Sequence, residues 1–294
     1  WKLVIDVPQI LVEDTRIAMA EMAAAYYGYP SREMQMIGVT GTNGKTSTTY
    51  MLKAIAERMG KKVGLIGTIR NMIGDIIIDT ERTTPESVDL QRILRQMKDE
   101  KVDVVIMEVS SHSLDQKRVH GIEYDVGEFT NLTQDHLDYH GTMEAYCDAK
   151  ARLFRQCRAA AVNGDDPWTP RLLENVTCPV TRFGQGLAND LVGWDAHYCA
   201  DRVSFTACSD SEHIPVTLHI PGAFSLYNAL AALAAAQALG IPIEDAAQAE
   251  RLVTILMGDK VEPRRQYISQ HANFNREDSF EAISDHAAEG RESR

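Results

Sequence analysis

The stretch GVTGTNGKTSTT, residues 38–49, decides the fold. It continues an apolar run that begins at Met34, and it leads into an amphipathic segment that ends at Gly60. An apolar strand, a glycine turn and a helix N-terminus in this order are typical of a phosphate-binding loop, because unpaired N–H groups and the helix dipole favour a polyphosphate there. The sequence therefore predicts an ATP site at this turn.

The spacing of this loop differs from the general pattern GxxxxGK[ST]. That pattern needs its first glycine at residue 39, where Val39 stands, and the chain has Gly41 instead. Lys45 is expected to neutralise phosphate charge, and the Thr46 hydroxyl is expected on Mg²⁺. A glycine turn that merely links strand to helix is the alternative, and the full run GTNGKTS after a strand argues against it. The predicted nucleotide contacts of the loop are Gly41, Thr42, Asn43, Gly44, Lys45, Thr46 and Ser47.

Strands alternate with helices along the first half of the chain. The strands are apolar throughout, which is typical of parallel strands covered on both faces. Residues 190–220 instead alternate apolar and polar side chains between turns, which predicts a small antiparallel sheet. The expected fold class is α/β, with a P-loop-type, mostly parallel sheet flanked by helices. We expect strands at 34–41, 62–68 and 102–111, and helices at 12–27, 46–60, 87–101 and 223–240.

The composition is that of a globular protein able to bury a core. Of 294 residues, 44% are apolar and 24% are charged, and the formal net charge is −12. Such an acidic chain does not favour nucleic acid as a partner, because phosphate backbones require a basic surface. No apolar run is long enough for a membrane span. Five scattered cysteines without CxxC spacing indicate reduced thiols, so we expect a cytoplasmic protein. Nothing sets the oligomeric state, and a monomer is the starting assumption.

Both ends of the chain depart from a complete globular protein. The first residues, WKLVIDVPQ, lack a signal-peptide pattern and an initiator Met, so we expect a chain cut from something longer. Residues 251–294 are polar, weakly periodic and poor in aliphatic side chains. That composition predicts a disordered or foreign tail.

Further motifs follow the loop in order. They are TTPE at 83–86, EVSSH at 108–112, TNLTQDHLDYHG at 130–141, AK at 149–150, PG at 221–222 and YNALAA at 227–232. Together with GTNGKTS, they resemble the MurE type of Mur ligase over about residues 1–250. The resemblance implies the end of an N-terminal domain with a linker helix at 1–35, a central ATP-binding domain at 36–250 and an atypical tail at 251–294.

Three side chains in these motifs suit ATP chemistry. Glu108 ends a buried strand, at the edge where open α/β sheets bind ligands, and its oxygens suit a hard metal ion. A merely solvated carboxylate at a strand end is the alternative. His136 is a candidate metal ligand, although a lone histidine is more often structural. Charge patterning alone makes Lys150 a lysine on a helix surface.

The resemblance assigns roles to these residues and adds others. It implies that His136 binds a second metal ion and that Lys150 is carbamylated, so that the anion helps to hold Mg²⁺. It also implies nucleotide contacts for Asn131 and Asn228, each of which could instead be a turn or cap residue. The implied catalytic set is Lys45, Glu108, His136 and Lys150, and the implied metal set is Thr46, Glu108, His136 and Lys150 as the carbamate. The residues implied for the UDP-muramoyl dipeptide are Thr83, Thr84, Ser110, Gln116 and Arg118.

The chain departs from the family pattern at several points. The family's DNPR motif, which selects the diamino acid in a C-terminal domain, is missing, and so is its GVPGR[FM]E junction after about residue 250. Ser225 replaces an Asn in PGxFN, and Arg82 stands where an Asn usually precedes TTPE. These departures predict a central ATPase domain without the domain for the amine substrate.

The function implied by the resemblance is ATP-dependent amide-bond formation in peptidoglycan precursor synthesis. A diamino acid, with meso-diaminopimelate expected over lysine, would be added to UDP-N-acetylmuramoyl-L-Ala-D-Glu through an acyl phosphate. One alternative is a nucleotide-binding fragment without catalysis. A folylpolyglutamate or cyanophycin-type ligase is another, which the intact TTPE and DHLDYHG segments argue against. A P-loop kinase would leave Lys150 unexplained.

Overall fold

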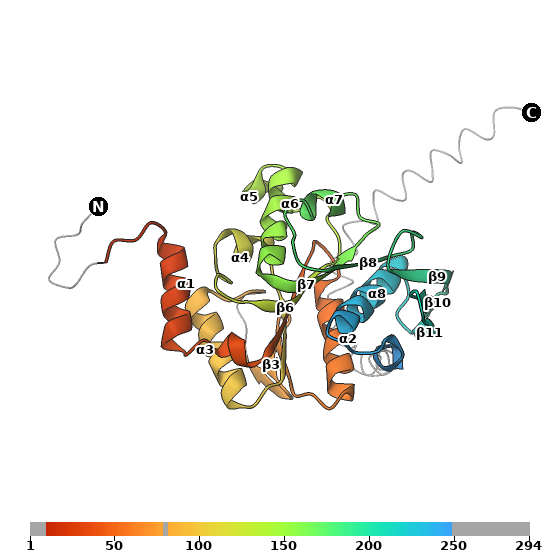
Figure 1. The fold of residues 1–294 in the computed structure, drawn as a ribbon, viewed down its shortest axis with the longest axis horizontal. Coiled ribbons are helices and arrows are strands. Elements are labelled where there is room, and N and C mark those ends of the chain that lie inside the picture. Colours follow the sequence, from red (N-terminus) through yellow and green to blue (C-terminus); the bar gives the residue numbers. More distant parts are fainter. Residues whose placement is uncertain (1–9, 79–81, 249–294) are drawn as a thin grey trace, which may run out of the picture. The chain divides into compact units, whose positions relative to one another are not determined.

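A single mixed sheet organises the molecule (Figure 1). The computed structural model describes residues 10–78 and 82–248. The strands in these ranges are β1 (Gln35–Thr40), β2 (Val63–Ile66), β3 (Asn71–Ile73), β4 (Ile76–Ile78), β5 (Val104–Glu108), β6 (Tyr124–Phe129), β7 (Cys157–Asn163), β8 (Val180–Gly184), β9 (Leu191–Tyr198), β10 (Val203–Cys208) and β11 (His213–Leu218). Their order in the sheet is β11-β10-β9-β8-β7-β6-β1-β5-β2-β3-β4.

Helices cover both faces of this sheet (Figure 1). The helices with defined bounds are α1 (Thr15–Tyr26), α2 (Lys45–Arg58), α3 (Ser87–Asp99), α4 (Ser111–Asp115), α5 (Leu137–His140), α6 (Met143–Ala151), α7 (Thr169–Leu172) and α8 (Ala223–Ala238), and the 3-10 turns are η1 (Pro30–Glu33) and η2 (Arg152–Gln156). Residues 243–248 are also α-helical. None of these helices has the length and the apolar character needed to cross a membrane.

The centre of the sheet is parallel, as its apolar strands predict. β1 pairs in parallel with β5 on one side and with β6 on the other. Met36 of β1 and Val105 of β5 lie in a buried core with side chains of α3 and α6. Because strand side chains alternate between faces, Ile37 and Ile106 point to the opposite face, where α2 and α8 pack. The carboxyl ends of β1, β5 and β6 therefore meet at one edge, between two helical layers.

The antiparallel strands predicted at 190–220 are confirmed, and they extend the same sheet. β9 pairs with β8 in parallel at Phe183 and Leu191, and β10 then pairs with β9 and β11 in antiparallel fashion. Side chains of β10 alternate between buried and half-buried. The alternating pattern identified the strands, but it carries no information about the neighbour with which the first of them pairs.

Local capping sets two element boundaries that differ from the expected ranges. α1 begins at Thr15 because Asp14 Oδ1 accepts hydrogen bonds from the N–H groups of Arg16 and Ile17 at 2.8 and 3.2 Å. The strand expected at 102–111 ends at Glu108, because the Ser110 side chain accepts from Ser113 N–H at 3.1 Å and so begins α4. The tail expected at 251–294 lies outside the described residues.

Candidate functional site

The phosphate loop lies where β1 ends and α2 begins. Gly41 and Gly44 have φ angles of +146° and +88°, a region that L side chains rarely adopt. A Cβ at Gly41 would lie 1.9 Å from Thr130 Oγ1, and one at Gly44 would lie 2.3 Å from Asn228 Oδ1. Gly44 precedes α2 and has no side chain that could cap the helix. The first N–H groups of α2 therefore receive no cap from this residue. Conformation and space together require glycine at both positions.

Residues that follow β6 hold this loop. Thr130 Oγ1 and Asn131 Nδ2 both donate to Asn43 O, at 2.6 and 3.0 Å. In return, Asn43 N–H donates to Asn131 Oδ1 at 3.0 Å, and Thr42 N–H donates to Asn131 O at 2.8 Å. The predicted nucleotide residue Asn131 therefore fixes the backbone of the loop.

Two lysines, the half-buried Lys45 and the buried Lys150, converge on the carbonyl of Gly41. Lys45 Nζ donates to Gly41 O and Thr42 O, both at 2.9 Å, and Lys150 Nζ donates to Gly41 O at 2.8 Å. Burial lowers the pKa of Lys45, and burial together with the charge of Lys45 lowers the pKa of Lys150 well below its usual value. Lys150 is only 1% exposed, and its Nζ lies 4.5 Å above the Tyr146 ring. The interpretation of Lys150 as a surface lysine is wrong, because the face of α6 that carries Lys150 packs against the phosphate loop.

Glu108 lies at the base of the loop and is only 1% exposed. Its Oε1 accepts from Thr46 Oγ1 at 2.9 Å and from Thr68 N–H at 3.1 Å. Its Oε2 accepts from Thr68 Oγ1 at 2.9 Å. The alternative of a solvated carboxylate is therefore wrong. The Thr46 hydroxyl and this carboxylate form a pair of hard oxygen donors at the start of α2, which suits Mg²⁺.

His136 lies in a cluster of aromatic rings beside the loop. Its ring centroid is 4.8 Å from that of His112 and 6.1 Å from that of Tyr146. Asp135 Oδ1 lies 3.5 Å from His136 Nδ1, and the charge of Asp135 also favours the charged forms of Lys45 and Lys150. Within residues 10–78 and 82–248, no group of three His, Cys, Asp or Glu side chains is arranged to hold a metal ion. The role of His136 as a metal ligand stays a prediction.

A cavity of about 300 Å³ adjoins the loop on its α8 side. It is lined by Asn43, Gly44, Ser47, Asn131, Asn163, Phe224, Tyr227 and Asn228. Aromatic rings and amide groups beside a phosphate loop fit a nucleoside. Asn163, Phe224 and Tyr227 were missed by the sequence analysis. A signal existed, because Asn163 ends an apolar strand at the ligand edge of the sheet and the two rings belong to the segment PGAFSLYN.

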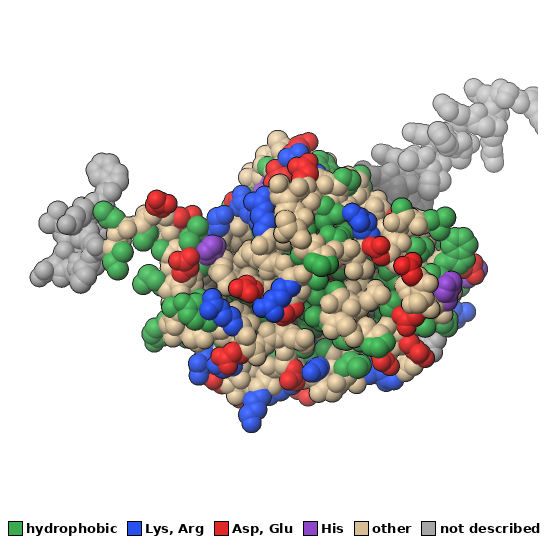
Figure 2. Space-filling view, viewed as in Figure 1, with side chains coloured by type: hydrophobic (Ala, Val, Ile, Leu, Met, Phe, Trp, Pro, Cys, Tyr) green, Lys and Arg blue, Asp and Glu red, His purple; other side chains and the backbone are tan. Residues whose placement is uncertain are grey.

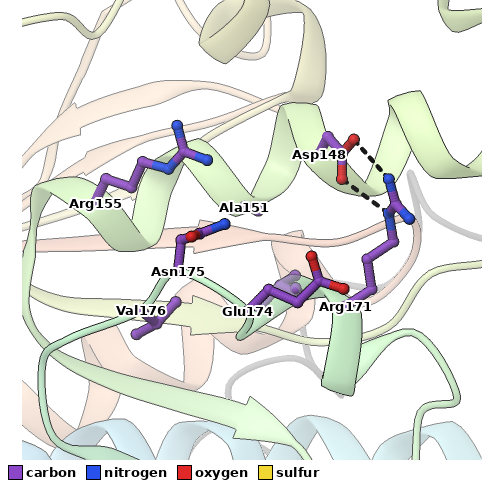
Figure 3. A pocket seen from close by; sticks show the side chains of 8 residues that line it. Asp148, Ala151, Arg155, Arg171, Glu174, Asn175 and Val176 are labelled. Atoms are coloured by element: carbon purple, nitrogen blue, oxygen red, sulfur yellow. Dashed lines mark hydrogen bonds and ion pairs between the residues drawn. The ribbon is translucent and has the colours of Figure 1, made fainter.

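A second cavity, of about 30 Å³, lies beside α6 and α7 (Figure 3). Arg171 donates to both carboxylate oxygens of Asp148 at its rim, each at 2.9 Å. The cavity has room for only a few water molecules. None of the predicted site residues lines it.

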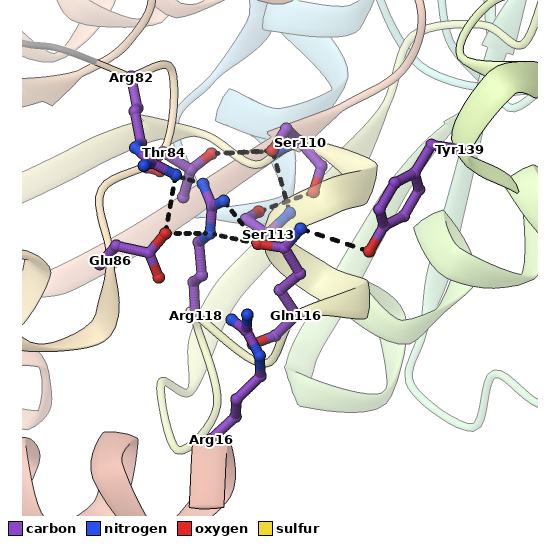
Figure 4. A network of polar contacts seen from close by, with 9 residues as sticks. All are labelled: Arg16, Arg82, Thr84, Glu86, Ser110, Ser113, Gln116, Arg118 and Tyr139. Atoms are coloured by element: carbon purple, nitrogen blue, oxygen red, sulfur yellow. Dashed lines mark hydrogen bonds and ion pairs between the residues drawn. The ribbon is translucent and has the colours of Figure 1, made fainter.

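Four of the residues predicted for the dipeptide form one polar network next to Glu108 (Figure 4). Arg118 Nη1 donates to Thr84 O at 3.1 Å, and Arg118 Nη2 donates to Gln116 Oε1 at 2.6 Å. Ser110 N–H donates to Thr84 Oγ1 at 3.1 Å, and Thr84 Oγ1 donates to Glu108 O at 2.9 Å. The structure therefore brings the predicted acceptor residues and the predicted metal ligand together.

Thr83, the fifth of these residues, joins the same site through Thr68. Their hydroxyl oxygens are 3.0 Å apart, and Thr68 donates to Glu108. The role of all five residues in substrate binding stays a prediction.

Residues 39–236, which include the loop, both lysines and the acceptor network, match the model of the Mur ligase middle domain. The chain belongs to the Mur ligase family. One Mur ligase relative is the UDP-N-acetylmuramoyl-L-alanyl-D-glutamate--2,6-diaminopimelate ligase of Geobacillus kaustophilus, which is 46% identical over 256 residues, or 84% of this chain and 52% of the relative. The protein of the same name from Geobacillus thermodenitrificans is 44% identical over 281 residues, or 92% and 56%.

Solved Mur ligase structures agree with this result. A structure of a UDP-N-acetylmuramoyl-L-alanyl-D-glutamate--2,6-diaminopimelate ligase aligns with a TM-score of 0.73 and 27% identity, over 80% of this chain and 50% of the other. Folylpolyglutamate synthase of Mycobacterium tuberculosis, solved with ADP and AMPPCP, aligns with a TM-score of 0.64 at 18% identity, over 80% and 62%, and shows the shared fold alone. The predicted MurE-type resemblance and the Mur ligase fold are confirmed. The chain spans about half the length of the curated relatives it matches.

Proposed function

We propose that this chain carries the ATP-binding and carboxylate-activating part of a ligase that adds diaminopimelate to UDP-N-acetylmuramoyl-L-alanyl-D-glutamate. The reaction would release ADP and phosphate, and it would serve peptidoglycan precursor synthesis in the cytoplasm. One observation carries the proposal: Thr46 of the phosphate loop donates to Glu108, which the acceptor network also contacts through Thr84. The names of the relatives support this choice of acceptor and of amino acid.

ATP would bind with its phosphates against the loop and its nucleoside in the adjoining cavity. The first N–H groups of α2 and the Lys45 ammonium group would contact the phosphate oxygens. Asn228 lines the cavity and lies against Gly44. We assign residues 36–250 to the central domain and residues 1–35 to the end of the preceding one.

The residues present fit a magnesium ion at the base of the loop. Thr46 and Glu108 would hold it through oxygen, and bound Mg²⁺ would neutralise charge on the phosphates during transfer. Lys150 fits carbamylation, because the lowered pKa favours the neutral amine that reacts with carbon dioxide. Lys45, which shares the Gly41 carbonyl with Lys150, would then pair with the carbamate anion.

The acceptor would bind at the network of Thr83, Thr84, Ser110, Gln116 and Arg118. Its reacting carboxylate attacks the γ-phosphate of ATP, the bond between the γ-phosphate and ADP breaks, and an acyl phosphate forms. The amine of diaminopimelate then attacks the acyl carbon, phosphate leaves, and the amine loses a proton. The chain supplies position and positive charge for the first of these two steps.

The test is ADP release by the purified chain with Mg²⁺-ATP and the acceptor, with and without diaminopimelate or lysine. We expect ADP release that requires the acceptor, because the acyl phosphate forms before the amine attacks, and we expect Lys45→Ala to abolish it. Release that proceeds equally without the acceptor would contradict the proposal.

A nucleotide-binding fragment without catalysis is the second candidate. The observation that favours it is the match to only about half of each relative. It predicts ATP binding that Lys45→Ala abolishes, with no ADP release under any combination of substrates.

A further inference from the structure

The short helix α5, which follows His136, lies at the outer end of α6 (Figure 1). It has four residues, Leu137–His140, and none of them is buried. Figure 2 shows charged side chains around the end of the molecule where α5 lies. A helix of this length is not stable by itself, and α5 buries no apolar side chain that could hold it in place. Its position must therefore depend on particular side-chain contacts.

Two of these contacts join α5 to α4. Tyr139 Oη donates to Asp115 Oδ2 at 2.8 Å. One residue further along α5, His140 Nε2 lies 3.0 Å from Ser111 Oγ. The Tyr139 ring also packs on the His112 ring, with centroids 4.3 Å apart. Tyr139 therefore contacts both ends of α4, although the residue is 42% exposed.

The Asp115 carboxylate is held from a second side. Its Oδ1 accepts from Arg152 Nη1 at 2.7 Å, and each of these two side chains is 35% exposed. Arg152 directly follows α6 and lies two residues after Lys150. Hydrogen bonds to a charged group are stronger than those between neutral groups. One carboxylate on α4 therefore ties down both α5 and the end of α6.

The backbone at His136 connects this arrangement with the nucleotide side of the site. His136 directly precedes α5 and has a φ of +52°, a region that L side chains rarely adopt. Its carbonyl accepts from the N–H groups of Tyr139 and His140 at 3.1 and 3.0 Å. A shift of α5 would therefore move the His136 ring. The His136 side chain is 47% exposed, so a metal ion can reach it.

The helix α4 is in turn held by the sheet. Glu108 is the last residue of β5, Val109 N–H donates to Val39 O at 2.8 Å, and Ser110 then caps α4. Glu108 and α4 thus share one support. The contacts between α5 and α4 therefore set where the His136 ring stands relative to the Glu108 carboxylate.

We propose that Tyr139 is a positioning residue. Its hydroxyl, bonded to Asp115, holds α5 on α4 and so keeps the His136 ring in place to bind the second metal ion that the family resemblance implies. This inference rests on the proposed function. Tyr139 acts through His136 and does not itself touch the metal ion or the nucleotide, so its removal should weaken one ion and spare the other.

The test is the Mn²⁺ affinity of the full chain with a non-hydrolysable ATP analogue, measured by electron paramagnetic resonance. In Tyr139→Phe, we expect the second Mn²⁺ ion to bind about tenfold more weakly, because the bond to the carboxylate is lost and α5 is released. The first ion, assigned to Thr46 and Glu108, should keep its affinity within about twofold. Affinity for the analogue itself, measured alongside, shows that the variant is folded.

Tyr198→Phe is the matched control. Tyr198 is 48% exposed, and its hydroxyl donates to the neutral Gln185 side chain at 3.3 Å. This variant loses the same atom from a surface tyrosine outside α5, and it should bind both Mn²⁺ ions as the wild type does. An equal weakening of the second ion in both tyrosine variants would overturn the inference.

A second substitution separates Asp115 from the other partner of the Tyr139 hydroxyl. Tyr139 Oη also accepts from Gln116 Nε2 at 3.3 Å (Figure 4). In an Asp115→Ala background, Tyr139→Phe should change the Mn²⁺ affinity by no more than about twofold, because the bond in question is already absent. A further loss of about tenfold in that background would mean that the hydroxyl acts through Gln116, and it would overturn the inference.

Failure of the inference can be told from failure of the proposed function. If the wild type binds two Mn²⁺ ions and Tyr139→Phe binds both equally well, the inference alone is overturned. If the wild type binds a single ion with the analogue, no second ion depends on His136, and the inference is again overturned. A wild type that binds no Mn²⁺ with the analogue would contradict the proposed function, and the inference would be overturned with it.

Discussion

The phosphate loop and the acceptor network meet at Glu108, yet they are held in different ways. The loop is held through its own backbone groups, to which Thr130 and Asn131 form hydrogen bonds, and its Gly41 and Gly44 leave no room for a Cβ. The acceptor network is fixed by side chains, and its outer member, Arg82, is half exposed. A region held by its backbone tolerates few residue types, whereas a region held by side chains can vary its charge. This difference explains why the chain keeps GTNGKTS and departs from the family pattern at residue 82.

The strongest test of this contrast is Gly44→Ala. We expect a loss of ATP affinity on the order of 100-fold, because the new methyl group collides with Asn228 and displaces the loop. Gly60→Ala is the matched control: Gly60 has a φ of +74°, and nothing lies within 4 Å of its Cβ position. Backbone strain should cost each variant about 1 kcal/mol of stability, and the collision with Asn228 should add to that cost in Gly44→Ala. Equal ATP affinity of the two variants, measured by calorimetry, would break the comparison.

Arg118→Lys tests whether the two regions can be separated. The substitution keeps the charge but removes the fork that binds Thr84 and Gln116, so we expect acceptor affinity to fall by about 30-fold. ATP affinity should stay within about twofold of the wild type. Arg158→Lys, on a side chain that is 70% exposed, is the control. A parallel loss of ATP affinity in Arg118→Lys would show that the network also supports the loop.

A substitution at Glu128 tests the stability of the sheet that carries both the phosphate loop and the acceptor network. Glu128 lies in β6 between Val39 and Ala161, is fully buried, and neither of its carboxylate oxygens has a hydrogen-bond partner among the described residues. Burial raises the pKa of Glu128 well above 4.5, so the folded state binds a proton that the unfolded state releases above that pH. Stability therefore falls as pH rises from about 4.5 towards the raised pKa.

We expect Glu128→Gln to abolish this pH dependence and to gain about 1–3 kcal/mol over the wild type above the raised pKa. Below pH 4.5 the two proteins should be about equally stable. Urea denaturation across this pH range measures the difference. Glu123→Gln, on an exposed side chain, is the control. If the wild type and Glu128→Gln differed in stability by the same amount at every pH, the Glu128 carboxylate would have to be stabilised by a hydrogen-bond partner or an opposite charge.

The smallest expected effect is that of Tyr227→Phe. The Tyr227 hydroxyl donates to Asp165 Oδ2 at 2.9 Å and so orients a wall of the nucleoside cavity. Loss of this bond should weaken ATP binding about fivefold and leave acceptor affinity unchanged. Tyr198→Phe removes a longer bond, to Gln185 at 3.3 Å, and should leave both affinities as they are. If Tyr227→Phe binds ATP as tightly as the wild type, the aromatic ring of residue 227 is sufficient to line the cavity and the hydrogen bond to Asp165 is not needed.

Local patterns predicted three of the parallel strands and the loop, but they did not predict β6, β7 or β8. Apolar runs bounded by Gly and by helix caps located β1, β2, β5 and α2 within a few residues, because their burial on both faces is visible in the sequence itself. The join between β8 and β9 was not predictable. The pairing of β9 depends on which exposed strand edge it meets in the folded chain. The spacing of apolar and polar residues along β9 does not indicate that edge.

The site could be predicted only in part, for a related reason. A lysine on a helix can face water or a neighbouring loop, and Lys150 faces the loop because Gly41 presents its carbonyl there. The cavity residues Phe224 and Tyr227 reach the loop through the packing of α8, which the sequence does not encode locally. Residues whose roles depend on the backbone were easier to identify than residues whose roles depend on tertiary contacts.

The contact between Gly41 and Thr130 has a consequence for the history of the family. A Cβ at residue 41 would lie 1.9 Å from Thr130 Oγ1, although the two residues are far apart along the chain. The same hydroxyl holds the loop at Asn43. A lineage that replaced this threonine by a larger residue would have to move its phosphate loop at the same time. The two positions are therefore expected to evolve as one unit, and a genome search that scores the glycine motif together with the threonine would separate true members from chance matches better than the motif alone.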